Sequence, residues 1–182
     1  MKNGLQAFDS DMHVYDPGFL YERYMNPRWG DRIPTGKGNG KHGRVEFSIG
    51  GGKQTLRGIT EVIDHGQKQV ADPYDFAVAR DYDAVSQLEA MDREGLDVAV
   101  LFRTSPLHCD ETLEPEYAND LCRAWNNWIT DFCRENPRRL KASALITLHD
   151  VGLAGGEVRR AAKELKVAGL SLCPEPINGK TV

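Results

Sequence analysis

The sequence predicts an α/β fold with a parallel sheet, because segments typical of buried strands alternate with segments typical of amphipathic helices. Four segments have the apolar character of strands: Gln6–Asp11, Asp97–Phe102, Lys141–Thr147 and Val167–Cys173. A helical pattern precedes each of the last three, and a long additional segment follows the first. Strands joined through helices run parallel with right-handed crossovers. Functional groups in such folds gather at the carboxyl ends of the strands, which is where a site is expected.

The three helices are predicted from the spacing of apolar residues and from signals at their ends. The first spans residues 81–95 and ends at Gly95, and the third spans residues 151–166. The second spans residues 114–137, with Pro115 in its first turn. Its apolar face follows steps of three and four and comprises Tyr117, Leu121, Trp125, Trp128 and Phe132. This spacing indicates that the aromatic residues pack in the core rather than bind a ligand.

The long segment after the first strand, Pro17–Arg80, is rich in glycine. Ten of the eighteen glycines lie between Gly30 and Gly66. Within it, "GRVEFSIGGGKQTL" alternates apolar residues before a glycine turn and predicts a small hairpin. The stretch "GNGKHG", residues 38–43, has the glycine spacing of a dinucleotide-binding loop but lacks the strand before it and the helix after it. We interpret it as loop, with disorder of residues 35–43 as the alternative.

Composition excludes several classes of function. The chain has 182 residues, of which 40% are hydrophobic and 27% charged, as in an ordinary globular protein. Its net charge of −4 provides no basic surface for nucleic acid or an anionic membrane. Its apolar runs are far shorter than the roughly 20 residues of a membrane helix, and the first residues lack the pattern of a secretory signal. Four cysteines without a CxxC pair indicate reduced thiols, so we expect a cytoplasmic protein.

The first predicted strand ends in a concentration of charge, in the stretch "FDSDMHVYDP". Side chains two apart on a strand point to the same face, so Asp9, Asp11 and His13 are expected to share one face. A carboxylate and an imidazole at this separation can reach one divalent cation, and this donor set suits zinc, manganese or iron. The structural alternative is that Asp11 caps a turn and His13 donates to a backbone carbonyl.

Three stretches together resemble the amidohydrolase-related metal enzymes, in the subgroup that includes aminocarboxymuconate-semialdehyde decarboxylase. They are "DSDMHVYDP", "AVSQLEAMDREGLDVAVLF" and "EYANDLCRAWNNWITDFCRENPRRLKASALITLHD". The resemblance implies a partial (β/α)8 TIM barrel of about four βα units, with one zinc or manganese ion at its mouth. By position, Asp11 takes a place that holds His or Glu in several relatives, and His13 takes the second ligand place. Asp16-Pro17 matches an acidic-Pro pair that often ends the motif.

Further candidates follow the second and third predicted strands. Arg103 and Thr104 stand where relatives commonly have Pro and Thr, and Arg103 could hold a substrate carboxylate bidentately. A solvated loop position for Arg103 is the alternative. His149, just past the third strand, is a third candidate for substrate binding. His108 and Asp110, in the loop after the second strand, are candidates of second rank.

The resemblance also implies a function and an extent. A whole barrel takes roughly 250 residues, and the family's later histidine ligands and catalytic Asp have no counterparts here. We therefore expect residues 1–182 to form the amino-terminal half of a barrel domain, with residues 17–80 as an inserted lid or interface segment. The implied activity is that of a metal-dependent hydrolase or non-oxidative decarboxylase (a carboxy-lyase) acting on a small-molecule carboxylate.

The truncated chain is expected to have little or no turnover. The alternative is a non-catalytic α/β binding or subunit-interaction fragment. A homo-oligomer and a second chain that completes the barrel are both open as assemblies.

Overall fold

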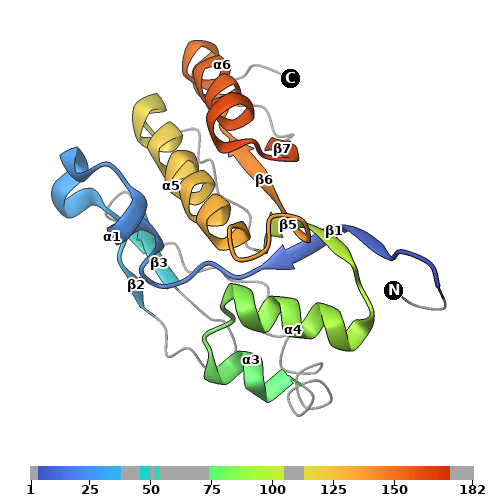
Figure 1. Cartoon of the computed structure of the whole chain (residues 1–182). Helices are drawn as coiled ribbons and strands as arrows, with labels where there is room; N and C mark the ends of the chain where they lie inside the picture. Colours follow the sequence, from blue (N-terminus) through green and yellow to red (C-terminus); the bar gives the residue numbers. More distant parts are fainter. Residues whose placement is uncertain (1–3, 38–45, 50–51, 54–73, 105–112, 173–182) are drawn as a thin grey trace.

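The computed structural model describes residues 4–37, 46–49, 52–53, 74–104 and 113–172. Its main feature is a curled sheet of four parallel strands in the order β1-β5-β6-β7 (Figure 1). The strands are β1 (Phe8–Val14), β5 (Val98–Arg103), β6 (Leu140–Ile146) and β7 (Gly169–Leu172). The predicted α/β class and the predicted strands are confirmed, each strand within three residues of its expected bounds.

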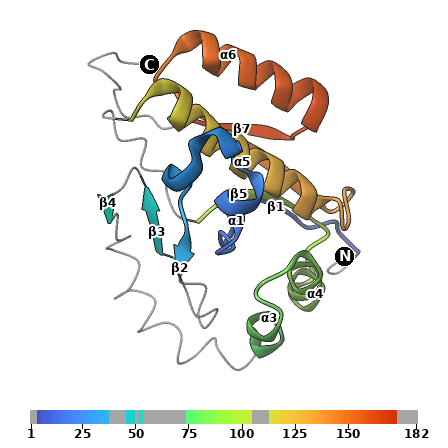
Figure 2. The ribbon, with the colours of Figure 1, turned by 90° about the vertical axis from the view of Figure 1, so that its left-hand side faces the viewer.

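Helices connect the consecutive strands, as the sequence predicted. They are α4 (Ala84–Glu94) before β5, α5 (Pro115–Cys133) before β6 and α6 (Val151–Arg160) before β7. Gly95 ends α4 in the left-handed conformation, with φ of 76°, which glycine adopts without steric strain. The helix α6 continues into a π-helical turn, Ala161–Leu165, before the chain enters β7. Helices α5 and α6 lie side by side along the sheet (Figures 1 and 2).

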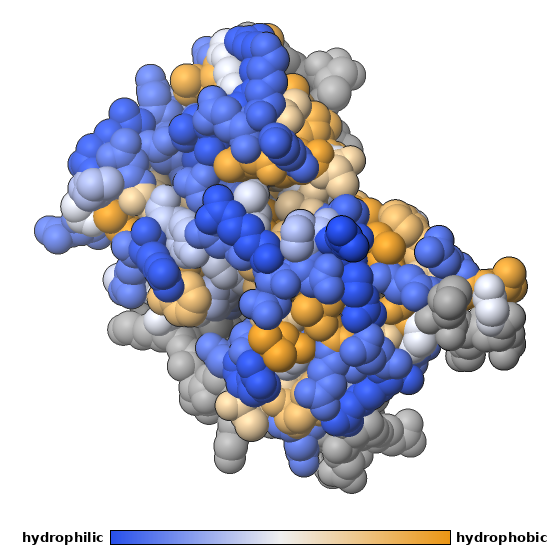
Figure 3. Space-filling model, in the orientation of Figure 1, coloured by the Kyte–Doolittle hydropathy of each residue, from blue (hydrophilic) through white to orange (hydrophobic). Residues whose placement is uncertain are grey.

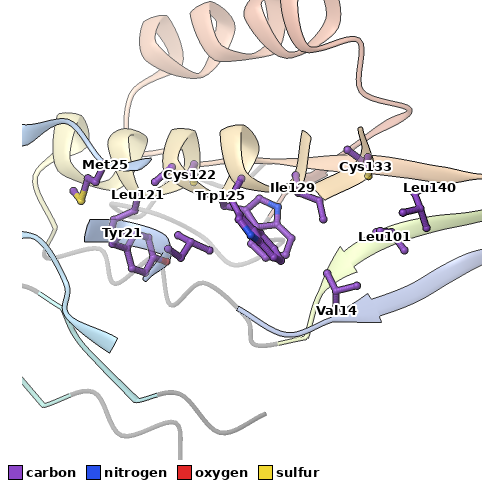
Figure 4. Packing of buried hydrophobic residues seen from close by; sticks show 14 of the residues in the cluster. Val14, Tyr21, Met25, Leu101, Leu121, Cys122, Trp125, Ile129, Cys133 and Leu140 are labelled. Carbon is purple, nitrogen blue, oxygen red and sulfur yellow. The ribbon is translucent and has the colours of Figure 1, made fainter. Parts of the chain in front are cut away.

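The core lies between the strands and α5. Val14, Leu101 and Leu140 from three neighbouring strands point toward Trp125 and the apolar residues that flank it on α5 (Figure 4). Trp125 is fully buried and its ring centroid lies 4.9 Å from that of Trp128. The prediction that the aromatic residues of this helix pack in the core is confirmed.

The first part of the inserted segment contributes to this core. Helix α1 (Leu20–Tyr24) packs on α5, with Leu20 and Tyr21 fully buried. The 3₁₀ helix Pro27–Arg32 follows, and its Trp29 Nε1 donates to the carboxylate of Asp120 on α5 at 2.8 Å. The sequence did not predict these contacts, because five helical residues are too few to show a helical period.

The second part of the inserted segment contains a small antiparallel sheet. It consists of β2 (Gly36–Lys37), β3 (Glu46–Ile49) and β4 (Gly52–Lys53). The predicted hairpin is confirmed as β3–β4, with β2 as an additional strand. Helix α3 (Asp75–Ala79) then lies beside α4 (Figure 2). The stretch "GNGKHG" lies outside the described residues.

Large apolar side chains are exposed at both outer strands of the four-stranded sheet. Leu5 and Phe8 are exposed at the start of β1, and Leu170 and Leu172 in β7. Among the described residues, neither β1 nor β7 pairs with a further strand on its outer side. Apolar patches interrupt the hydrophilic surface on the face seen in Figure 3. No described helix has both the length and the apolar character needed to span a membrane.

Candidate metal centre

Asp11 and His13 come together at the carboxyl end of β1. Oδ1 of Asp11 lies 3.5 Å from Nε2 of His13, and the two side chains are 79% and 50% exposed, respectively. The other ring nitrogen of His13, Nδ1, lies 2.9 Å from the carbonyl oxygen of Arg103 on β5. A carbonyl oxygen can only accept, so Nδ1 carries a proton, and in this tautomer the lone pair of Nε2 lies on the side of Asp11. Metal-binding histidines are commonly held in this way.

A bulge in β1 separates Asp9 from this pair. The pairing with β5 shifts register between Asp9 and Met12, which interrupts the regular alternation of side-chain directions expected along the strand. The carboxylate of Asp9 accepts the backbone N–H of Asp11 at 2.9 Å. Sequence alone gave no sign of the bulge, and the expectation that Asp9 shares the face of Asp11 and His13 is therefore wrong.

The separation of the two donor atoms fits a shared cation. With zinc–ligand bonds of about 2.0–2.1 Å, two donor atoms of a tetrahedral zinc ion lie about 3.3–3.4 Å apart. The observed 3.5 Å between the carboxylate oxygen and the imidazole nitrogen is close to this value. The described residues contain no group of three or more His, Cys, Asp or Glu side chains that could hold a metal ion. The pair thus fits as two ligands of a site that needs three or four.

Arg103 is buried in an ion pair next to the candidate centre. Its side chain is 5% exposed, and its Nε donates to the carboxylate of Asp16 at 2.7 and 3.0 Å. Nη2 also donates to Asp16, and to the hydroxyl of Tyr21 at 3.2 Å. Burial alone would lower the pKa of Arg103, but the Asp16 carboxylate raises it above its usual value. Burial raises the pKa of Tyr21, so this hydroxyl stays neutral.

These contacts make Arg103 an interior residue rather than a solvated one. It follows Ala99 and Leu101 in the buried alternation of β5, and its guanidinium lies over the ring of Trp125, 5.8 Å from the centroid. Nη1 is buried and has no hydrogen-bond partner among the residues that the structure describes. A direct role in binding substrate stays a prediction. The sequence reading missed the pairing with Asp16, for which the only signal was an acidic residue directly before Pro17.

The other two substrate-binding candidates also lie at the carboxyl ends of strands. The backbone N–H and the hydroxyl of Thr104 both donate to the carbonyl oxygen of Val14, at 3.0 and 2.8 Å. His149 is buried after β6, and its Nδ1 lies 2.5 Å from the hydroxyl of Thr147. The second-rank candidates of the loop after β5 fall outside the described residues.

The fold is shared with solved enzymes. No protein-family model and no curated protein matches the sequence, whereas 41 solved chains match the structure. An amidohydrolase from Mycobacterium avium subsp. paratuberculosis matches with a TM-score of 0.66 and 18% identity, over 96% of this chain and 51% of that one. A 5-carboxyvanillate decarboxylase from Novosphingobium aromaticivorans, complexed with manganese and 4-hydroxy-3-methoxy-5-nitrobenzoic acid, matches with a TM-score of 0.56 and 18% identity, over 98% and 44%.

The fold is half of a (β/α)8 barrel. The 5-carboxyvanillate decarboxylase of Sphingomonas paucimobilis gives the same result, with a TM-score of 0.55, 18% identity and coverage of 94% and 44%. The chain spans about half the length of the solved chains that it matches. Similarity at this level of identity shows a common fold, and it agrees with the partial TIM barrel and the amidohydrolase resemblance expected from the sequence.

Proposed function

We propose that this half-barrel carries the first two ligands of a divalent metal centre in an amidohydrolase-type enzyme, a hydrolase or non-oxidative decarboxylase of a small carboxylate. The observation that carries the proposal is the Asp11–His13 pair, with Nε2 of His13 directed to the side of Asp11. The fold supports it, since the solved neighbours include an amidohydrolase and decarboxylases, one of them with manganese. The donor set accepts both zinc and manganese.

Each residue of the pair has a distinct role in this proposal. Asp11 contributes an anionic oxygen that offsets the charge of the cation, and His13 contributes a neutral nitrogen whose direction is set by the Arg103 carbonyl. A divalent ion bound there supplies charge that polarises a substrate oxygen or lowers the pKa of a bound water. The high exposure of both side chains leaves the remaining coordination positions open to a small carboxylate.

Substrate contacts are proposed for His149 first. The side chains of Arg103 and Thr104 are engaged in holding β1 and β5 together. His149, with Thr147, lies at the carboxyl end of β6, the second strand along from β1 in the sheet. We propose little or no turnover for residues 1–182 alone, because the described residues provide two metal ligands where catalytic sites use at least three.

A second candidate function is a non-catalytic binding or subunit-interaction fragment. The exposed apolar residues of the outer strands favour it, since unpaired strand edges are templates for pairing with another chain. Either a homo-oligomer or a different chain that completes the barrel would cover them. Metal binding distinguishes the two functions.

The test is equilibrium dialysis of the 182-residue chain against a series of zinc and manganese concentrations. We expect one ion per chain, lost in His13→Ala and Asp11→Ala and retained in Asp9→Ala, the matched control two residues from Asp11. A chain that binds no metal, or that binds it equally well as His13→Ala, contradicts the proposed metal centre and favours the interaction fragment.

A further inference from the structure

We propose that the buried Asp16–Arg103 ion pair is a positioning device for His13, acting through the main-chain carbonyl of Arg103. This proposal rests on the proposed function for its relevance to metal binding, but the orientation of the His13 ring can be tested without metal. Asp16 and Arg103 contact neither metal nor substrate in it. They act on the ligand through the backbone that holds it.

Two contacts join the chain at the end of β1 to the end of β5, one through a side chain of each segment. The ring of His13 donates to the main chain of Arg103 at 2.9 Å, and the side chain of Arg103 returns to Asp16, three residues after His13. Asp16 receives the guanidinium through both carboxylate oxygens. The result is a closed circuit of covalent and hydrogen bonds that contains the candidate ligand.

A single peptide group is the central part of this circuit. The carbonyl of Arg103 and the N–H of Thr104 belong to the same peptide plane. Its carbonyl accepts from His13 and its N–H donates to Val14, at 2.9 and 3.0 Å. Rotation of this plane would break both bonds, so whatever fixes the plane also fixes the ring of His13.

The side chain of Arg103 is well suited to fix that plane. Its guanidinium is confined by Asp16, by the Tyr21 hydroxyl and by the ring of Trp125. A planar guanidinium held side-on through Nε and Nη2 has less freedom than a lysine ammonium. With the side chain held at its far end, the Cα of Arg103 and the following peptide cannot turn independently.

Stability alone explains this ion pair poorly. Buried ion pairs gain little over well-packed apolar residues, because two charges must be desolvated. Within the described part of the chain the desolvation is incompletely compensated, since Nη1 of Arg103 is buried there without a partner. In some proteins such a pair is retained for conformational specificity. Here the neighbouring group that needs a specific orientation in the proposed site is the imidazole of His13.

The first test is the tautomeric state of His13 in the metal-free protein, measured by long-range ¹H–¹⁵N spectra of the imidazole. The wild-type ring is expected to carry its proton on Nδ1. In Asp16→Asn one of the two acceptor oxygens becomes an NH2 group that cannot accept from the guanidinium, the ion pair is lost, and the ring is expected to become a mixture of tautomers. An unchanged ring in Asp16→Asn overturns the proposal.

The second test is zinc affinity, measured with the same variants. Loss of an outer contact to a metal-binding histidine weakens affinity by about 10–100-fold, which is expected for Asp16→Asn. Glu157→Gln is the matched control, because Glu157 is also a buried carboxylate paired with arginines, Arg123 and Arg160, but on α6. Equal weakening in both variants reveals a general loss of stability and overturns the proposal.

Two further readouts keep the outcomes separate. If circular dichroism shows that Asp16→Asn does not fold, Arg103→Lys replaces it as the test variant, since lysine keeps the charge but not the planar contact. The same mixture of His13 tautomers is expected in Arg103→Lys, and an unchanged ring overturns the proposal. If the wild type binds no zinc, the proposed function fails, while the ring spectra still decide whether Asp16 and Arg103 orient His13.

Discussion

Asn126 on α5 takes the place of a neighbouring strand for part of β6, and its replacement is expected to be strongly destabilising. Among the described residues, strands β5 and β6 pair over three positions, from Ala99 opposite Leu140 to Leu101 opposite Ala142. Farther along β6, the backbone N–H of Leu145 donates to Oδ1 of Asn126 at 2.6 Å, and its carbonyl accepts from Nδ2 at 3.0 Å. Nδ2 also donates to the buried carboxylate of Glu157 at 2.8 Å.

The magnitude follows from these three hydrogen bonds. In Asn126→Ala each lost bond removes about 1 kcal/mol, and the N–H and C=O of the half-buried Leu145 lose their Asn126 partner. A polar group left unsatisfied costs about 1–3 kcal/mol when it is buried. Since the two terms overlap, we expect the free energy of unfolding to fall by about 3–5 kcal/mol. With a urea m-value of about 2 kcal/mol/M, the unfolding midpoint then falls by about 1.5–2.5 M.

Urea unfolding followed by far-UV circular dichroism measures this change. Asn127→Ala is the neighbouring control: Asn127 is half-buried and accepts one bond from Arg160 at 2.9 Å, so its loss should change the free energy of unfolding by less than about 1 kcal/mol. A decrease below about 1 kcal/mol for Asn126→Ala, or equal decreases for both variants, would refute the role assigned to Asn126.

Two further predictions concern a buried thiol and a close backbone contact. Burial raises the pKa of Cys133 to about 12. Because the unfolded thiol ionises at a lower pH, the free energy of unfolding should fall as the pH rises from about 9 toward 12. Urea unfolding of Cys133→Ala over the same pH range should show a smaller decrease in that free energy. A Cβ at Gly36 would clash with the carbonyl oxygen of Gly18, so Gly36→Ala should displace β2 and speed proteolytic cleavage of the inserted segment. Gly156→Ala, where a Cβ would meet no atom within 4 Å, should not.

The sequence predicted the elements whose pattern is local and long. The apolar steps of α5 extend over about five helical turns, and they placed Trp125 and Trp128 in the core correctly. Helix α1 has five residues and could not show a period, although Tyr21 is among the largest fully buried side chains. Its burial depends on α5, about 100 residues away in the chain.

In the candidate site, too, local features were predicted and contacts between distant residues were not. Two residues of one strand, Asp11 and His13, were predicted as a pair from their spacing, and the structure brings their donor atoms within 3.5 Å. Asp9 was misplaced because a bulge depends on the pairing with β5, which no local pattern reveals. Arg103 was considered for substrate because it follows a strand and can hold a carboxylate bidentately. Its pairing with Asp16, 87 residues away in sequence, is not visible in any local pattern.

The exposed candidate ligands Asp11 and His13 and the buried pair Asp16–Arg103 differ in what their variants can show. Asp11 and His13 are 79% and 50% exposed, and an exposed ion pair adds about 0–1 kcal/mol to stability. Loss of metal in their alanine variants can therefore be attributed to the missing donor atom rather than to unfolding. Asp16 and Arg103 are each 5% exposed, so removal of one partner affects both fold and ring orientation. A readout specific to the His13 ring separates those effects directly, whereas zinc affinity separates them only when Asp16→Asn is compared with the Glu157→Gln control.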